Sequence, residues 1–200
     1  MSEAHPVPAP LRALDRWVTG HFALVAAFAW GLAEATCFFV VPDVLLSLIA
    51  ARRLRPAFHA SLAALAGALL GGAIMVAFGA RAPEATRTFL DHVPAIGPRM
   101  IATAQTALDR HGAWATMTGP LGGMPYKIYA VEWGARHGAL ATFLLVSIPA
   151  RYLRFILSVL LARGIAASVE GWTRRPAVVV ALWVAFWAGL YSMYWSHVPR

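Results

Sequence analysis

The stretch 120-PLGGMPYK-127, from Pro120 to Lys127, lies in an apolar part of the chain and combines two prolines, two glycines and a lysine. Proline and glycine both oppose a continuous helix. A lysine inside an apolar segment is costly unless it is paired, hydrated or close to an interface. The stretch therefore predicts a break in a helix rather than a straight span, with Lys127 placed at that break.

The composition of the whole chain predicts a membrane protein. Of its 200 residues, 60% are hydrophobic and 13% are charged, and the mean hydropathy is +0.62. One water-soluble core of this size cannot cover so much apolar surface. The net charge of +8 comes from scattered basic residues, which favours anionic lipid headgroups, and not nucleic acid, as the partner. We therefore expect an all-α, multi-pass protein of the cell membrane, which is the inner membrane if the source is a Gram-negative bacterium.

Apolar segments of two kinds alternate along the chain. Residues 57–80, 138–162 and 177–195 each fit a helix of about 20 residues, the length needed to cross a bilayer. Residues 22–51 are too many for one span and too few for two. Residues 111–137, which contain the quoted stretch, also fit a straight span poorly, because their centre is broken by prolines and glycines. We predict two re-entrant hairpins, which enter and leave the membrane on one side. Their breaks are placed at Pro42 in the first hairpin and at Pro120, Gly122, Gly123 and Pro125 in the second.

A hairpin followed by a span occurs twice, which predicts an inverted-repeat arrangement within residues 21–163. Residues 1–20 are predicted as a tail and an interfacial turn. Residues 81–110 are predicted as a surface loop with a short amphipathic helix. Residues 164–200 are predicted as a loop followed by a C-terminal transmembrane helix. Interrupted segments at corresponding positions of two halves indicate a transporter-like site at mid-membrane.

Small residues recur at a helical interval on the span 57–80. Ala63, Gly67 and Gly71 lie four residues apart. Such a strip lets a second helix approach closely, so it predicts packing and no chemistry.

Six charged residues fall inside the apolar segments, and each would cost about 2.5–3.5 kcal/mol at a helix centre. They must therefore be paired, hydrated or near an interface. Two interpretations are open: structural ion pairs that hold the hairpins to the bundle, or a polar cavity used by a charged substrate or by protons. The six residues are Glu34, Asp43, Lys127, Glu132, Arg151 and Arg154.

The basic residues of this group suit a phosphate. Arg151 and Arg154 are three residues apart and project from one helix face, and guanidinium groups hold oxyanions in a bidentate manner. Lys127 would enter from the hairpin break, where free backbone N–H groups also favour an anion. Substrate binding is therefore assigned to Lys127, Arg151 and Arg154. The alternative for the two arginines is that they extend to the lipid headgroups.

The acidic residues of the first hairpin, Glu34 and Asp43, are assigned to proton coupling. A carboxyl group held in a low-dielectric site can take up and release protons near neutral pH. Asp43 follows Pro42 and could instead cap the helix that begins there. We also expect Lys127 to reach Asp43, and Glu132 to have a partner outside its own helical turn. No metal-ligand spacing is found, so no metal, cofactor or catalytic residue is predicted.

Taken together, these motifs resemble the DedA family, also called the SNARE-associated or VTT-domain family, and are most similar to its YqaA-like branch. The likeness covers residues 22–163. It implies two re-entrant hairpins that face each other, and movement of phospholipids or of undecaprenyl phosphate across the membrane with the proton gradient. Two positions depart from the family's pattern, because Thr118-Gly119 stands where an arginine is expected and Met75 where a tyrosine is expected. The likeness is carried by Glu34, Pro42-Asp43, Gly67, Gly71, Gly79, Gly119-Pro120, Pro125-Tyr126-Lys127, Gly134, Phe143, Arg151 and Arg154-Phe155.

The expected function is that of a transporter or flippase-like protein, and not an enzyme, that moves a lipid phosphate among membrane lipids. A homo-oligomer is left open. One alternative is a non-catalytic structural or assembly protein whose charges only pair internally. A lesser alternative is a lipid-phosphate hydrolase.

Overall fold

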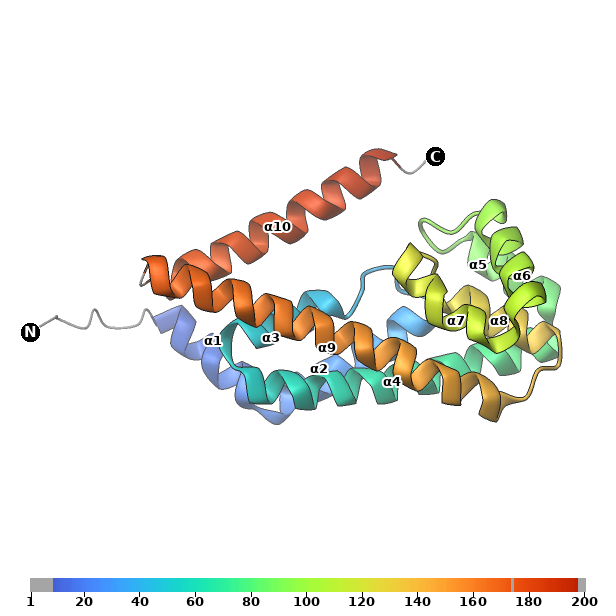
Figure 1. Cartoon of the computed structure of the whole chain (residues 1–200), viewed down its shortest axis with the longest axis horizontal. Helices are drawn as coiled ribbons and strands as arrows, with labels where there is room; N and C mark the ends of the chain where they lie inside the picture. The colour runs from blue at the N-terminus through green and yellow to red at the C-terminus, as the bar shows by residue number, and fades with distance from the viewer. Residues whose placement is uncertain (1–8, 174, 198–200) are drawn as a thin grey trace, which may run out of the picture.

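The computed structural model describes residues 9–173 and 175–197. These residues form helices and no strand, which confirms the all-helical class (Figure 1). Two long helices, α4 (Leu54–Arg81) and α9 (Leu140–Thr173), lie against each other and run in opposite directions. They form the frame on which the shorter helices pack.

Among the described residues, three helices are long and apolar enough to cross a membrane, namely α4, α9 and α10 (Pro176–His197). At 1.5 Å per residue, α4 is about 42 Å long and exceeds a hydrocarbon core of about 30 Å. The predicted spans 57–80 and 177–195 match α4 and α10. The helix α9 also matches its prediction at the start, but it continues to Thr173 through part of the segment predicted as a loop.

The N-terminal prediction needs a correction. Residues 1–8 of the predicted tail lie outside the described residues, and the predicted interfacial turn is the helix α1 (Ala9–Thr19). A bend of 71° at Gly20 separates α1 from α2 (His21–Thr36), and this bent pair would count as a fourth span if its two helices crossed together.

The first predicted hairpin consists of two helices joined by a break. Helix α2 packs along α4 and ends at Thr36, and after residues 37–42 the chain returns as α3 (Asp43–Arg52). The return is fixed at its far end, because Arg52 donates two hydrogen bonds of 2.8 and 2.9 Å to Asp15 of α1. Pro42 is the N-cap residue of α3, as the predicted break requires.

The second predicted hairpin has an irregular first arm. Three short helical turns, η1 (Gly112–Trp114), α7 (Ala115–Thr118) and η2 (Gly119–Gly122), take the place of one apolar arm, and α8 (Tyr126–Ala135) forms the second arm. At the break, Gly123 has a φ of +80°, a conformation that favours glycine. Pro125 is the N-cap residue of α8. Re-entrance into a membrane remains a prediction for both segments.

Glycines let both hairpin segments lie directly on α4. A Cβ at Gly67 would be 2.0 Å from the carbonyl oxygen of Phe28 in α2, and a Cβ at Gly79 would be 2.2 Å from that of Val131 in α8. The predicted small-residue strip therefore packs against α2. Gly79, further along α4, makes the same kind of close contact with α8. Because both contacts are between backbones, α4 fixes the positions of the two breaks relative to each other.

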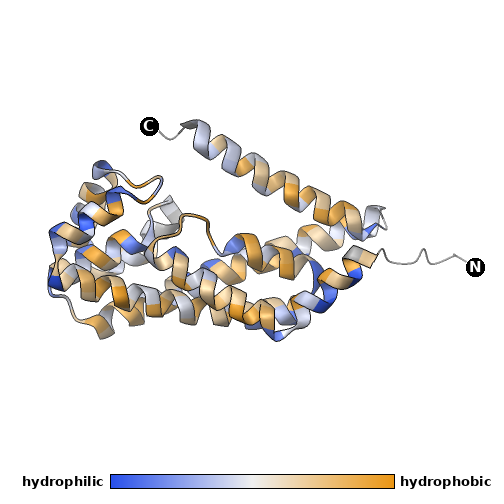
Figure 2. Cartoon of the chain, turned by 180° about the vertical axis from the view of Figure 1, so that it is seen from behind, coloured by the Kyte–Doolittle hydropathy of each residue, from blue (hydrophilic) through white to orange (hydrophobic). Residues whose placement is uncertain are grey.

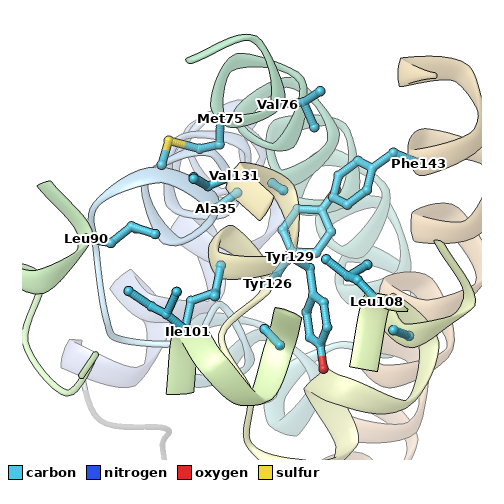
Figure 3. Packing of buried hydrophobic residues seen from close by; sticks show 14 of the residues in the cluster. Ala35, Met75, Val76, Leu90, Ile101, Leu108, Tyr126, Tyr129, Val131 and Phe143 are labelled. Atoms are coloured by element: carbon cyan, nitrogen blue, oxygen red, sulfur yellow. The ribbon is translucent and has the colours of Figure 1, made fainter. Parts of the chain in front are cut away.

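The segment 81–110 holds two helices, α5 (Pro83–Asp91) and α6 (Pro98–His111). The predicted amphipathic helix is α6, whereas α5 was not foreseen. Leu90 of α5 and Ile101 and Leu108 of α6 are buried in one cluster with Tyr126 and other residues of α8 (Figure 3). These two helices therefore cover one end of the bundle and hold α8 in place.

Hydrophilic residues gather at the two ends of the bundle, over α5 and α6 at one end and around α1 and the start of α4 at the other (Figure 2). The part between them is mostly hydrophobic. Helix α10 packs against the bundle along one face, through Trp183, Trp187 and Tyr191, whereas large apolar side chains of this helix such as Phe186 and Met193 are exposed. This distribution is the one expected of a protein surrounded by lipid.

Candidate functional site

The two chain breaks meet in the middle of the molecule. Lys127, in the first turn of α8, donates a hydrogen bond of 2.9 Å to the carbonyl oxygen of Phe38, in the break between α2 and α3. The lysine is only 2% exposed. Its ammonium group therefore binds a backbone carbonyl of the irregular segment between the two helices, outside their own hydrogen bonding.

A buried ion pair joins α2 to α9 beside this contact. Arg151 donates a hydrogen bond to Glu34 and is 1% exposed. Its guanidinium carbon lies 4.5 Å from the ring centroid of Tyr126 and 5.4 Å from that of Phe155, which are cation–π distances. Among the described residues, Nε and Nη1 of Arg151 have no hydrogen-bond partner. Because buried donors normally have an acceptor, this arginine retains the capacity to bind one.

A second ion pair joins the first break to α9 one turn further along. Arg154 donates to one carboxylate oxygen of Asp43, and the hydroxyl of Ser158 donates to the other. Asp43 is the first residue of α3, and within the described part of the chain no side chain caps this helix. The capping role considered for Asp43 is therefore wrong. Its negative charge is nevertheless well placed at a helix N-terminus.

A cavity of about 270 Å³ opens where these groups meet. Its wall carries the charged residues Glu34, Lys127 and Arg154, and its far side is closed by α10. There the hydroxyl of Tyr191 accepts a hydrogen bond of 3.1 Å from the backbone N–H of Val41, in the first break. The cavity thus lies between the two breaks, α9 and α10.

The predicted site residues are brought together, but their pairing differs from the prediction. Lys127 does not bond Asp43, because Asp43 is taken by Arg154 and Lys127 reaches the carbonyl of Phe38 instead. Arg151 does not line the cavity, although its partner Glu34 does. Both arginines are bound inside the bundle, so extension of their side chains to the headgroups is wrong for this conformation.

Glu132 lies away from this site, at the polar end of the bundle where α8 finishes beside α5 and α6. Its carboxylate accepts two hydrogen bonds of 2.8 Å from Arg87 and one of 3.0 Å from Gln105, and Arg136 lies 3.4 Å away. The expected partner outside its own helical turn is thus Arg87. Burial opposes the charged carboxylate, but the hydrogen bonds from Arg87 and Gln105 outweigh it and hold the pKa of Glu132 below its usual range.

Sequence reasoning missed three members of the site. Tyr191 and Ser158 are ordinary residues of apolar helices, and only the packing of α10 and α9 against the first break gives them partners. The carbonyl of Phe38 carries no side-chain signal. A free carbonyl could have been expected there only once the break was placed, because Phe38 lies beyond the C-cap residue of α2, where no helix supplies a donor.

Within residues 9–173 and 175–197, no three His, Cys, Asp or Glu side chains lie together in a way that could hold a metal ion.

The fold and the site define an all-helical protein whose described residues include three candidate membrane-spanning helices and a buried charged site between two broken segments. Comparisons with models of protein families, with curated proteins and with solved structures gave no match. The resemblance to the DedA family therefore stays a prediction that rests on the residues themselves.

Proposed function

We propose that the protein binds a lipid phosphate in the cavity between its two breaks and moves it across the membrane, as a transporter or flippase does. The observation that carries the proposal is the cavity itself, which has Lys127 and Arg154 in its wall. Guanidinium and ammonium groups are the ones that bind phosphate in proteins, and both are held here in an apolar surrounding that strengthens their interaction with an anion.

The two carboxylates control the charge available to such a ligand. Lys127, Arg151 and Arg154 supply three positive charges, and Glu34 and Asp43 offset two of them through the arginines. A phosphate must therefore compete with the carboxylates. Protonation of Asp43 would release Arg154, which lines the cavity, and protonation of Glu34 would remove a negative charge from the cavity wall. Either step would favour the phosphate, which couples binding of the ligand to uptake of a proton.

The broken segments supply the moving parts. In a membrane, irregular backbone is tolerated only where it is buried in protein or lines a water-filled cavity, and both breaks border the cavity. We place the two segments in the membrane as re-entrant hairpins of an inverted repeat, whose tips meet at the contact between Lys127 and Phe38. If the two broken segments separate first on one side of this contact and then on the other, the cavity is exposed to the two membrane faces in turn.

One observation favours the structural alternative, in which the charges only hold the bundle together. Each charged group at the site already has an internal partner, although Nε and Nη1 of Arg151 remain without an acceptor among the described residues. The two functions differ in what happens when one partner is neutralised. A structural pair affects only stability, whereas a transport site affects the response to protons and to phosphate.

A hydrolase receives less support from the geometry. The described residues that line the cavity include no serine, cysteine or histidine to act as nucleophile or base. We therefore propose transport without covalent chemistry.

The test is a flipping assay in vesicles of phosphatidylcholine that contain the reconstituted protein and a phosphatidate with a fluorescent acyl chain, whose outer-leaflet fraction is read by an impermeant quencher. Arg154→Gln should lower the initial rate by about tenfold or more, because it removes a charge-assisted contact to the phosphate. Glu34→Gln should weaken the response of the rate to a pH gradient, and the double variant Glu34→Gln/Asp43→Asn should abolish it, because neither amide can exchange a proton. The matched control is Arg99→Gln, at an exposed position of α6, which should behave as the wild type. Equal rates in Arg154→Gln and Arg99→Gln, with lowered stability in the former alone, would establish the structural alternative.

A further inference from the structure

A second, larger cavity lies beside the proposed phosphate site. It has a volume of about 510 Å³ and forms a groove between α9 and α10, with α3 at its floor. Its wall is apolar, with Ala162, Ile165 and Phe186 among the residues that line it. Both walls belong to helices long and apolar enough to cross a membrane.

The polar side chains that line the groove are already engaged with each other or with the first break. At the floor, the hydroxyl of Ser47 accepts hydrogen bonds of 2.9 and 3.1 Å from the indole N–H groups of Trp183 and Trp187. The other lining hydroxyl, of Ser158, donates to Asp43. The groove therefore matches a hydrocarbon chain and not a peptide or a sugar.

The groove and the charged cavity adjoin each other along α9 and α10. Arg154 lines the cavity and Ser158, one turn later, lines the groove. Both side chains bind the same carboxylate, that of Asp43. On α10, Trp187 lines the groove and Tyr191, again one turn later, lines the cavity. The boundary between a charged and an apolar compartment therefore lies at Asp43.

We infer that the groove between α9 and α10 binds the hydrocarbon chain of the same lipid whose phosphate occupies the cavity at Lys127 and Arg154. The inference rests on the proposed function for its charged end. From Ser158 to Val169 the groove follows α9 for about 16 Å at 1.5 Å per residue, which accommodates a stretch of extended chain. The substrate class is thus an amphiphile that carries a phosphate and a long chain, and soluble phosphates lack the second half of the contact.

The arrangement assigns a role to α10. Only 6% of the most apolar stretch of this helix is buried in the molecule, so it is held to the bundle mainly at the groove, at the first break and at its turn from α9. The hydrocarbon chain of a lipid can therefore enter the groove from the bilayer beside α10, without crossing the core formed by α4, α8 and α9.

Photolabelling tests the inference with the full-length protein in phosphatidylcholine vesicles. The probe is a phosphatidate that carries a diazirine in one acyl chain, and labelled residues are mapped by mass spectrometry. Label should concentrate on the groove-lining residues of α9 and α10, and excess unlabelled dioleoyl phosphatidate should remove it. Ala162→Phe fills the groove and should lower groove labelling by about fivefold or more. Ala167→Phe, at an exposed position of the same helix outside the groove, should leave it unchanged.

If Ala162→Phe does not fold, Ile165→Trp fills the groove from a more exposed position and should give the same loss. Label spread evenly over both faces of α9 and α10, and unaffected by either variant, would overturn the chain site and leave the phosphate site standing. Label that stays in the groove but is displaced equally well by dioleoylglycerol would instead support the chain site and overturn the proposed lipid-phosphate function.

Discussion

Glu132 is a fully buried carboxylate that holds side chains from three parts of the chain together. Arg87 comes from α5, Gln105 from α6, and Arg136 follows α8. Removing the charge from one member of a buried hydrogen-bonded group leaves the others under-satisfied. Glu132→Gln should therefore lower the free energy of unfolding by about 2 kcal/mol at pH 7, measured by thermal unfolding in detergent.

The pH dependence of this loss follows from the lowered pKa of Glu132. A carboxyl group whose pKa is lower in the folded than in the unfolded state stabilises the fold above its unfolded value of about 4.3. That contribution is lost as the pH falls through the lower folded value. The difference between wild type and Glu132→Gln should therefore be constant near neutral pH and shrink in the acidic range below about 4.3. Glu84→Gln is the matched control, because Glu84 binds the same Arg87 at 2.6 Å from an exposed position and should cost little. Equal losses in both variants would contradict the role of burial.

The sequence predicts which residues of the site are charged and buried, but not how they pair. An unpaired charge within an apolar segment costs free energy, so each charged residue of the site is expected to have a partner. These residues are Glu34, Asp43, Lys127, Arg151 and Arg154. Three cations and two acids allow several pairings of similar energy, and the choice depends on the packing of α9 against α2 and α3. The predicted contact between Lys127 and Asp43 failed for this reason, since the hydroxyl of Ser158 and Arg154 reach Asp43 together.

At the scale of the elements, the close contact of α4 with α8 depends on Gly79. A Cβ there would lie 2.2 Å from the carbonyl oxygen of Val131, and backbone atoms cannot move aside as a flexible side chain can. Gly79→Ala should therefore separate the two helices and lower the free energy of unfolding by about 1–3 kcal/mol.

Gly164 supplies the matched control for this prediction. It lies at an exposed position of α9, and among the described residues no neighbouring atom would come within 4 Å of a Cβ added there. Gly164→Ala should raise the free energy of unfolding by up to about 1 kcal/mol, because alanine has the higher helix propensity. The unfolding free energies of both variants are measured by thermal unfolding in the same detergent. A stabilising effect of Gly79→Ala would contradict the backbone contact between α4 and α8.

Helical elements were predicted well where length and composition decide them. The helices α4 and α10 follow from uninterrupted apolar runs, and the breaks at Pro42 and Pro125 follow from missing N–H groups. The first arm of the second segment was predicted less well. Its residues from Gly112 to Gly122 form short turns, because the packing of η1, α7 and η2 against α6 and α9 replaces regular hydrogen bonding as the source of order. No local sequence signal reports such packing.

At the scale of the whole molecule, the two polar ends define which parts should face water on each side of a membrane. One end carries α1 and the turn from α3 to α4, and the other carries α5, α6 and the turn from α8 to α9 (Figures 1 and 2). Since α4 joins the two ends and is longer than the hydrocarbon core is thick, the ends should lie on opposite faces. If both broken segments are re-entrant, each segment must begin and finish at the same end.

Cysteine labelling in sealed vesicles tests this arrangement directly. In a Cys37→Ser background, which removes the single native thiol, cysteines replace exposed residues before and after each broken segment. Arg16→Cys and Arg53→Cys bracket the first segment, and Arg99→Cys and Ala139→Cys bracket the second. A membrane-impermeant maleimide should label both members of one pair and neither member of the other. The reason is that the polar ends of the bundle cannot lie in hydrocarbon, and α4 places the two pairs at opposite ends. Labelling of Arg16→Cys and Arg53→Cys from opposite sides would mean that residues 22–51 cross the membrane, and the two facing hairpins would then be wrong even though the buried ion pairs remain.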